Sequence, residues 1–232
     1  MKCVIMQPTY LPWAGYFNLI SQADIFVFLD DVQYERRSWQ SRNRILLNNK
    51  PYFLTVPVHS LTQSQIINTI KLDDSQNWRA KHFKTVEHTY SKHPYQKEIL
   101  IILQCLFDKS VQNLSELNIV LIQTLSGYLG LSKKFLRASD LNIDGKRSEH
   151  IFKICEYLNC NEYLSPIGSK EYLQEDKVFE QSKIKLSFQK YEPATYPQLK
   201  CPNFISHLSI IDVVANIGWQ GTLEYIKNGK IY

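Results

Sequence analysis

Two adjacent carboxylates, Asp30 and Asp31, follow five apolar residues at positions 25–29, and their placement suggests chemistry. An apolar run of that length is typical of a buried strand, and ligands of open α/β sheets bind at the carboxyl ends of parallel strands. A carboxylate there can act as a general base, orient an amine or bind a divalent cation. The alternative is that a carboxylate simply caps a turn. We favour a functional role for at least one of the two, without deciding which.

A second candidate segment, residues 7–13, follows the apolar residues 3–6 and contains two prolines, two aromatic residues, a glutamine and a threonine. The prolines stiffen this loop, and Gly15 lets a helix begin close to a ligand, with backbone amides that would point at an anion. Gln7, Tyr10 and Tyr16 could hydrogen-bond to a substrate. An equally good interpretation is a rigid surface turn whose aromatic residues cover the core.

Four arginines, Arg36, Arg37, Arg42 and Arg44, hold the local excess of positive charge. Solvated surface charge is the preferred interpretation for the first pair. Arg42 and Arg44 flank Asn43 at the start of a strand, so they share a face and could form a fork for phosphate.

Three weaker signals occur later in the chain. Gly168 and Ser169 begin a helix after a strand that ends near Ser165, which is a weak signal for an anion site. His82 is as easily a surface or packing histidine as a catalytic one. Asp212 lies among apolar residues of a helix, so we expect it to have a partner and a structural role.

The elements that position these residues alternate between strands and helices. Strands are expected at 3–6 and 25–29 with a helix at 15–22 between them, which makes a parallel βαβ unit. A β-hairpin is expected with strands at 44–47 and 52–56 around a turn at 48–51, where Asn tolerates the left-handed conformation. Helices near 76–91, 95–108 and 113–129, with Ser75 and Asn113 as candidate N-caps, form a central insert. The alternation resumes with strands at 134–137, 162–164 and 184–188, helices at 148–158 and from 169, and two C-terminal helices at 209–218 and 221–227.

The prediction is an α/β fold with a parallel Rossmann-like sheet flanked by helices, a β-hairpin and a helical insert. We expect one domain over residues 1–232, with its α/β core at 1–60 and 131–232 and the insert at about 74–130. The 232 residues, 44% of them hydrophobic, suffice for a core without disulfides. The net charge of +5 is diffuse and is weak evidence for nucleic acid.

The cysteines and the N-terminus indicate the compartment. The five cysteines are odd in number and lack zinc-type spacing, so free thiols and no metal site are expected. No signal peptide or membrane span is evident, so a cytoplasmic protein without membrane insertion is expected.

Several of these segments resemble the WbqC-like family: residues 7–17, Ala23-Asp24, residues 30–34, Ser38-Trp39 and residues 42–44. The resemblance continues through residues 163–172, 196–198 and 208–212, with Pro166 where a glycine is expected, and so covers nearly the whole chain. It implies an association with bacterial O-antigen and related polysaccharide gene clusters. It also implies a suggested activity, the transfer of glycine or another aminoacyl group to an amino-sugar.

A second, weaker similarity is to pantothenate synthetases and nucleotidyltransferases, which also begin with a strand and a Pro-Thr turn. Their helix begins with a His-x-Gly-His element, whereas Trp13-Ala14-Gly15-Tyr16 stands there in this chain. The missing histidines put ATP activation by that route in doubt, and ATP with magnesium stays a candidate cofactor.

The leading hypothesis is an acyl or aminoacyl transferase that forms an amide on a nucleotide-linked amino-sugar. Its donor is open, and a charged tRNA would be the one nucleic-acid partner. The alternatives are a nucleotidyltransferase-like, ATP-dependent ligase and a non-catalytic protein that binds a sugar nucleotide. The candidate catalytic residues are Asp30, Asp31, Tyr10 and His82, and the candidate substrate-binding residues are Gln7, Pro8, Thr9, Trp13, Gly15, Tyr16, Gln33, Arg42, Asn43, Arg44, Ser165, Gly168 and Ser169.

Overall fold

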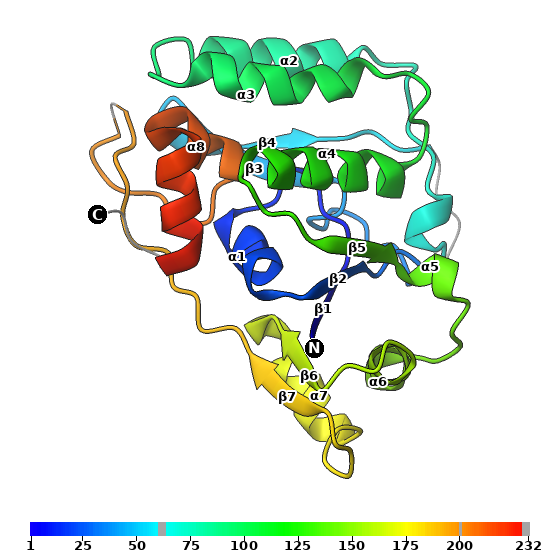
Figure 1. The fold of residues 1–232 in the computed structure, drawn as a ribbon. Coiled ribbons are helices and arrows are strands. Elements are labelled where there is room, and N and C mark those ends of the chain that lie inside the picture. Colours follow the sequence, from blue (N-terminus) through cyan, green and yellow to red (C-terminus); the bar gives the residue numbers. More distant parts are fainter. Residues whose placement is uncertain (60–63, 200, 229–232) are drawn as a thin grey trace.

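The fold is built on a five-stranded parallel sheet, seen edge-on in Figure 1, with the strand order β5-β2-β1-β6-β7. The computed structural model describes residues 1–59, 64–199 and 201–228. The strands are β1 (Lys2–Met6), β2 (Ile25–Phe28), β5 (Lys134–Arg137), β6 (Glu162–Ser165) and β7 (Lys185–Phe188). The expected α/β fold with a parallel, Rossmann-like sheet is therefore confirmed. Residues 60 and 229–232, at the limits of the predicted core, lie outside the described residues.

Side chains of the central strands point alternately to the two faces of the sheet and so contribute to two hydrophobic cores, one on each face. Val4, Phe26 and Phe28 belong to one buried cluster, whereas Cys3 and Val27 belong to the other. Successive side chains of a strand point to opposite faces, so an entirely apolar strand is buried on both sides. The first face is covered by α1 (Ala14–Gln22), α4 (Leu114–Tyr128) and α8 (Ile210–Asn228), and the second by α6 (Arg147–Tyr157) and α7 (Lys170–Asp176).

The β-hairpin consists of β3 (Arg42–Leu47) and β4 (Lys50–Thr55), paired from Arg42–Thr55 to Leu47–Lys50. Both turn residues are left-handed, with φ of 51° at Asn48 and 60° at Asn49. Asparagine tolerates this conformation, and a two-residue turn of this kind matches the twist of its strands. The predicted hairpin is confirmed. Both of its strands begin two residues earlier than expected, so its turn consists of Asn48 and Asn49 rather than residues 48–51.

The predicted insert is helical and includes an outer layer, α2 (Trp78–Thr89) beside α3 (Gln96–Leu103), which lies over the hairpin and α4 (Figure 1). Asn113 caps α4 as expected, because its side chain accepts from the amides of Ser115 and Glu116. Ser75 does not cap α2: its hydroxyl donates to Asp73, and the N-cap position belongs to Asn77.

The remaining differences concern element boundaries. The predicted helix at 95–108 is α3 followed by the 3₁₀ turn η2 (Gln104–Phe107). The short turns η1 (Ile67–Thr69), η3 (Ile167–Ser169) and α5 (Ala138–Leu141) were not predicted. The two C-terminal helices follow each other in α8 and are separated by Gly218, whose φ of 67° interrupts the helix. No helix in the described ranges is long and apolar enough to cross a membrane.

Candidate functional site

The chain adds β2 and β5 on one side of β1, and β6 and β7 on the other. The order in which the parallel strands are added therefore reverses at β1. The carboxyl edge of such a sheet gathers the loops that follow its strands and is the usual place for a ligand. The segments that follow the five strands begin at Gln7, Leu29, Ala138, Pro166 and Gln189. The candidate site is therefore expected at this edge of the sheet.

The loop after β1 is largely buried, unlike the surface turn that was the alternative interpretation. Tyr10 and Leu11 have no exposed surface. Asn43 donates from Nδ2 to the carbonyl oxygens of both residues, at 3.1 Å and 2.8 Å, and Asn118 of α4 donates to the carbonyl of Pro8. Of the predicted site residues in this loop, Gln7, Thr9 and Trp13 are partly exposed. Pro8 and Tyr10 are buried in this conformation.

Tyr10 and His82, both predicted as catalytic, lie against each other. The Tyr10 hydroxyl is 2.9 Å from Nδ1 of His82, which is 6% exposed. Burial and, to a smaller extent, the charge of Lys81 together lower the pKa of His82 to about 4, although a hydrogen bond with the Thr55 backbone opposes the shift. The imidazole is therefore neutral at pH 7, so that it links the loop after β1 to the hairpin and to α2 without adding charge.

Gly15 has a packing role at the start of α1. A Cβ atom on this residue would lie 2.1 Å from the Trp13 indole, which folds back over the helix. The Trp13 ring also contacts His207, with ring centres 4.6 Å apart. Tyr16 is buried and donates its hydroxyl to the Gln7 carbonyl, while the Gln7 side chain accepts from Gln40. Indole rather than open space thus covers the glycine that we expected to lie close to a ligand.

Asp30 joins the ends of two neighbouring strands. Its carboxylate accepts from the backbone amide of Ser139 at 3.0 Å and from the Ser139 hydroxyl at 2.9 Å. Burial raises the pKa of Asp30 above its ordinary value, the hydrogen bonds from Ser139 oppose the rise, and the charge of Asp31 adds to it. A carboxylate has about four lone-pair positions, so Asp30 retains acceptor capacity beyond Ser139.

Asp31 pairs with a residue that the sequence did not indicate, His150 of α6. Oδ2 of Asp31 lies 3.0 Å from Nε2 of His150, whose side chain is 6% exposed. The other atoms of the pair, Oδ1 and Nδ1, are buried and have no hydrogen-bond partner within the described ranges. Gln33, two residues beyond, is exposed and pairs with Ile66 in an isolated bridge.

A pocket of about 450 Å³ opens beside Asp30 at this edge. That volume is within the range of small-molecule sites. Charged residues of both signs line it. Two of them, Arg137 and Glu116, form an ion pair with 2.6 Å between Nη2 and Oε2. The Ser115 hydroxyl is buried without a described hydrogen-bond partner. The lining includes Asp30, Lys71, Ser115, Glu116, Arg137 and Ser139, and we call it the edge pocket.

Sequence reasoning found only Asp30 among the lining residues. A signal for Ser139 was available, since it follows a predicted strand, but the pairing of that strand with β2 was unknown. Ser115 and Glu116 are contributed by the first turn of α4, in the insert, where no sequence pattern indicates proximity to the sheet edge.

The remaining predicted residues lie elsewhere. The Arg42 guanidinium stacks over Phe53 at 4.4 Å, and that of Arg44 lies 5.4 Å from the Trp39 ring and donates to the His207 carbonyl. Neither arginine lines the edge pocket. Ser165 is buried and donates to the Pro166 carbonyl, whereas Gly168 is exposed and Ser169 makes no side-chain cap to α7.

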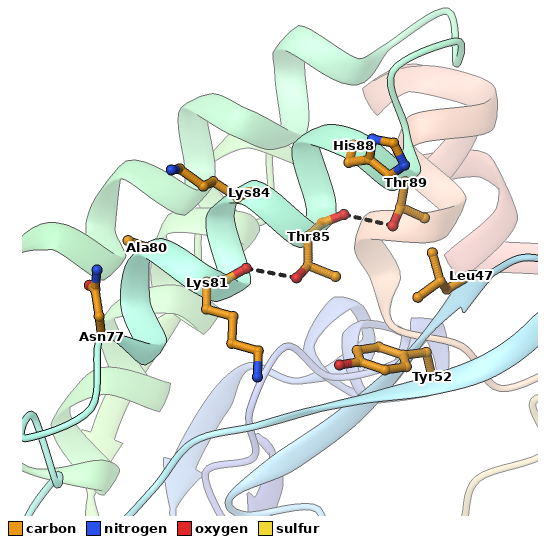
Figure 2. A pocket seen from close by; sticks show the side chains of 9 residues that line it. All are labelled: Leu47, Tyr52, Asn77, Ala80, Lys81, Lys84, Thr85, His88 and Thr89. Atoms are coloured by element: carbon orange, nitrogen blue, oxygen red, sulfur yellow. Dashed lines mark hydrogen bonds between the residues drawn. The ribbon is translucent and has the colours of Figure 1, made fainter.

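A second concavity lies between β4 and α2. Two adjoining cavities of about 550 and 570 Å³ share Tyr52, Asn77, Lys81 and Thr85. Figure 2 shows Lys81 directed toward Tyr52, with Lys84 and His88 on the same helix. His82 lines the floor, so this groove also reaches the Tyr10–His82 contact.

Comparison with known proteins identifies the family. The model of the WbqC-like protein family matches residues 7–224. The chain is also 31% identical over 228 residues to the Uncharacterized protein Rv1507c of Mycobacterium tuberculosis (strain ATCC 25618 / H37Rv), and the match covers 97% of each chain. No solved structure matches the chain significantly. On the extent of these two matches, the chain belongs to the WbqC-like protein family.

Proposed function

We propose that the protein transfers an acyl or aminoacyl group to the amine of a nucleotide-linked amino-sugar, in the synthesis of bacterial surface polysaccharide, and that the edge pocket is its acceptor site. The observation that carries the proposal is a buried carboxylate, Asp30, in the wall of a polar pocket at the carboxyl edge of the sheet. Membership of the WbqC-like family supports the polysaccharide context through the resemblance described above.

The reaction requires a base beside the amine. The amine nitrogen attacks the activated carbonyl carbon of the donor and forms the amide bond, while the bond from that carbon to the leaving group breaks. The nitrogen must lose a proton as it attacks, and Asp30 is the residue we assign to accept it. A raised carboxyl pKa makes it a stronger base than a carboxylate in water.

The charged residues of the pocket suit the rest of the acceptor. Lys71 and Arg137 are the cations that we assign to the diphosphate, in place of Arg42 and Arg44. The Ser115 hydroxyl is free to bond to a sugar hydroxyl. Asp31 and His150 do not line the pocket, so we assign them to positioning: they hold the loop that carries Asp30.

The test is to mix the purified protein with UDP-, dTDP- and GDP-linked amino-sugars and with activated donors, and to weigh the products by mass spectrometry. The donors are an aminoacyl thioester, an aminoacylated RNA, and an amino acid with ATP and magnesium. The expected product is one sugar nucleotide heavier by the acyl group, and the matching N-acetylated sugar nucleotide should not react because its nitrogen is not nucleophilic.

Two results would overturn the proposal. Tight binding of a sugar nucleotide without product from any donor would indicate a binding protein. Formation of a nucleotidyl product with release of pyrophosphate would indicate a nucleotidyltransferase.

A further inference from the structure

The groove between β4 and α2 extends along the whole of α2. Tyr52 and Lys81 line both of the cavities described above. A third cavity adjoins them at the C-terminal end of α2, where His88, Lys92 and His93 line it. The 12 residues of α2 correspond to a length of about 18 Å at 1.5 Å per residue. This is longer than a mononucleotide requires.

Positive charge lines this groove without compensation. Lys81, Lys84 and Lys92 line it and form no ion pair within residues 1–59, 64–199 and 201–228. Over those same ranges, no Asp or Glu lines any of its three cavities. Unpaired ammonium groups in a row attract a ligand with several negative charges.

An exposed aromatic ring borders the same groove. Tyr52 of β4 lines it and is 38% exposed. The ring of the next residue, Phe53, is 40% exposed but points to the opposite face of the hairpin, where the Arg42 guanidinium lies over it at 4.4 Å. Beyond it, Trp39 is 49% exposed and packs against both Phe53 and Arg44. An open aromatic face such as that of Tyr52, beside a positive groove, is the combination that proteins use to bind single-stranded nucleic acid, by stacking bases and neutralising phosphates.

We infer that this groove binds a single-stranded polynucleotide, with phosphates along Lys81, Lys84 and Lys92 and a base stacked on Tyr52. Its length and its three lysines favour a strand of several nucleotides over a mononucleotide, and the exposed Tyr52 ring favours a polynucleotide over an inorganic polyanion. The binding does not depend on the proposed reaction.

A short ribbon separates the groove from the edge pocket. Pro57 lines the groove and Lys71 lines the pocket, and the two segments pair through His59 N–H to the Lys71 carbonyl and Asp73 N–H to the Pro57 carbonyl. Resting on the proposed function, we assign the donor to the aminoacylated 3′ end of an RNA, because a strand in the groove would end beside the acceptor.

The test is fluorescence anisotropy with labelled six-nucleotide single strands of RNA and DNA, which carry no acyl group, over a range of salt concentrations. We expect salt-sensitive binding of at least the RNA strand. Lys81→Gln and Lys84→Gln should each reduce the slope of log K against log salt by about 0.7, the value for one phosphate of a single strand. Tyr52→Ala should weaken binding by about 5- to 150-fold, the equivalent of one stacked base. Tyr52→Phe keeps the aromatic ring and should bind as tightly as the wild type.

The matched control is Lys97→Gln, an exposed lysine of α3 that lines none of the three cavities. It should leave the affinity and the slope close to those of the wild type. Absence of binding to both strands would overturn the inference, as would equal losses in Lys97→Gln and the groove variants. Polyphosphate binding as tight as that of the strands, with no effect of Tyr52→Ala, would assign the groove to inorganic polyanions instead. Because no acyl transfer is measured, these failures are distinct from failure of the proposed reaction.

Discussion

Asp31 of the loop after β2 and His150 of α6 form a partly buried pair 119 residues apart in sequence, with Oδ2 of the carboxylate 3.0 Å from Nε2 of the imidazole. Asp31→Asn should reduce the free energy of unfolding by about 1.5–3 kcal/mol, the scale of a hydrogen bond to a charged group. A double-mutant cycle with His150→Gln, measured by urea unfolding, should show a favourable coupling energy: the double variant should lose less stability than the sum of the two single variants. Asp144→Asn, at an exposed acid just before α6, is the control. Strictly additive losses would show that the two side chains do not interact.

His82 should make the fold less stable in mild acid. Its pKa in the folded protein is about 4, against 6.5 for the unfolded chain. The unfolded chain therefore binds more protons between these values, and the stability that neutral His82 contributes above pH 6.5 is lost as pH falls toward 4. His82→Gln should remove this part of the pH dependence in urea unfolding at pH 4 to 7. Tyr10→Phe should retain it, and identical pH profiles for His82→Gln and the wild type would contradict the burial of a neutral imidazole.

Asp212 should have the opposite effect on the pH dependence of stability: it should make the fold less stable as pH rises from about 4 to 6. It is fully buried in α8 and accepts hydroxyl hydrogen bonds from Tyr90 and Tyr196 at 2.8 Å and 2.6 Å, so the expected structural partners exist. Burial raises its pKa to about 6, although the hydrogen bonds oppose the rise. Its contribution to stability is therefore present below pH 3.8 and is lost as pH rises through 6.

Asp212→Asn removes that titration and keeps the shape of the side chain. Relative to the wild type, its free energy of unfolding should increase steadily from pH 4 to pH 6 and then level off. A constant difference between the two proteins across this range would mean that Asp212 titrates normally.

Gly15→Ala should disturb the N-terminal loop, since the added methyl group would meet the Trp13 indole at 2.1 Å. Displacing the indole should cost about 1–3 kcal/mol, as for other overpacked sites, and change the tryptophan fluorescence. Gly127→Ala in α4 is the matched control, because no atom lies within 4 Å of its added methyl group. The control should be stabilised by about 0.5–1 kcal/mol through helix propensity. A neutral Gly15→Ala variant would mean that Trp13 moves freely.

The fold could be predicted because its signals are local. Apolar runs locate the strands at 3–6 and 25–29, and the asparagines in 48–51 indicate the turn of the hairpin. The site depends instead on which loops meet. Ser139 contacts Asp30 only because β5 pairs with β2, and that strand order is not encoded in any spacing along the chain.

The burial of Tyr10 has the same explanation. Its loop could have been either a site or a turn over the core, and it is buried because Asn118 and His82, both in the insert, pack against it. Packing between segments 70 or more residues apart cannot be deduced from local periodicity. The predicted residues are therefore divided between the sheet edge, the hairpin and the groove.

The most direct test of the acceptor site is the single-turnover rate of Asp30→Asn, with the acceptor and donor that yield product in the mass-spectrometric screen. Asparagine retains the shape and the hydrogen bonding to Ser139 but cannot accept a proton from the amine. We predict a rate at least about 100-fold below that of the wild type, with the dissociation constant of the sugar nucleotide largely unchanged. A folded Asp30→Asn protein that forms the amide at the wild-type rate would contradict the assignment of Asp30 as the base.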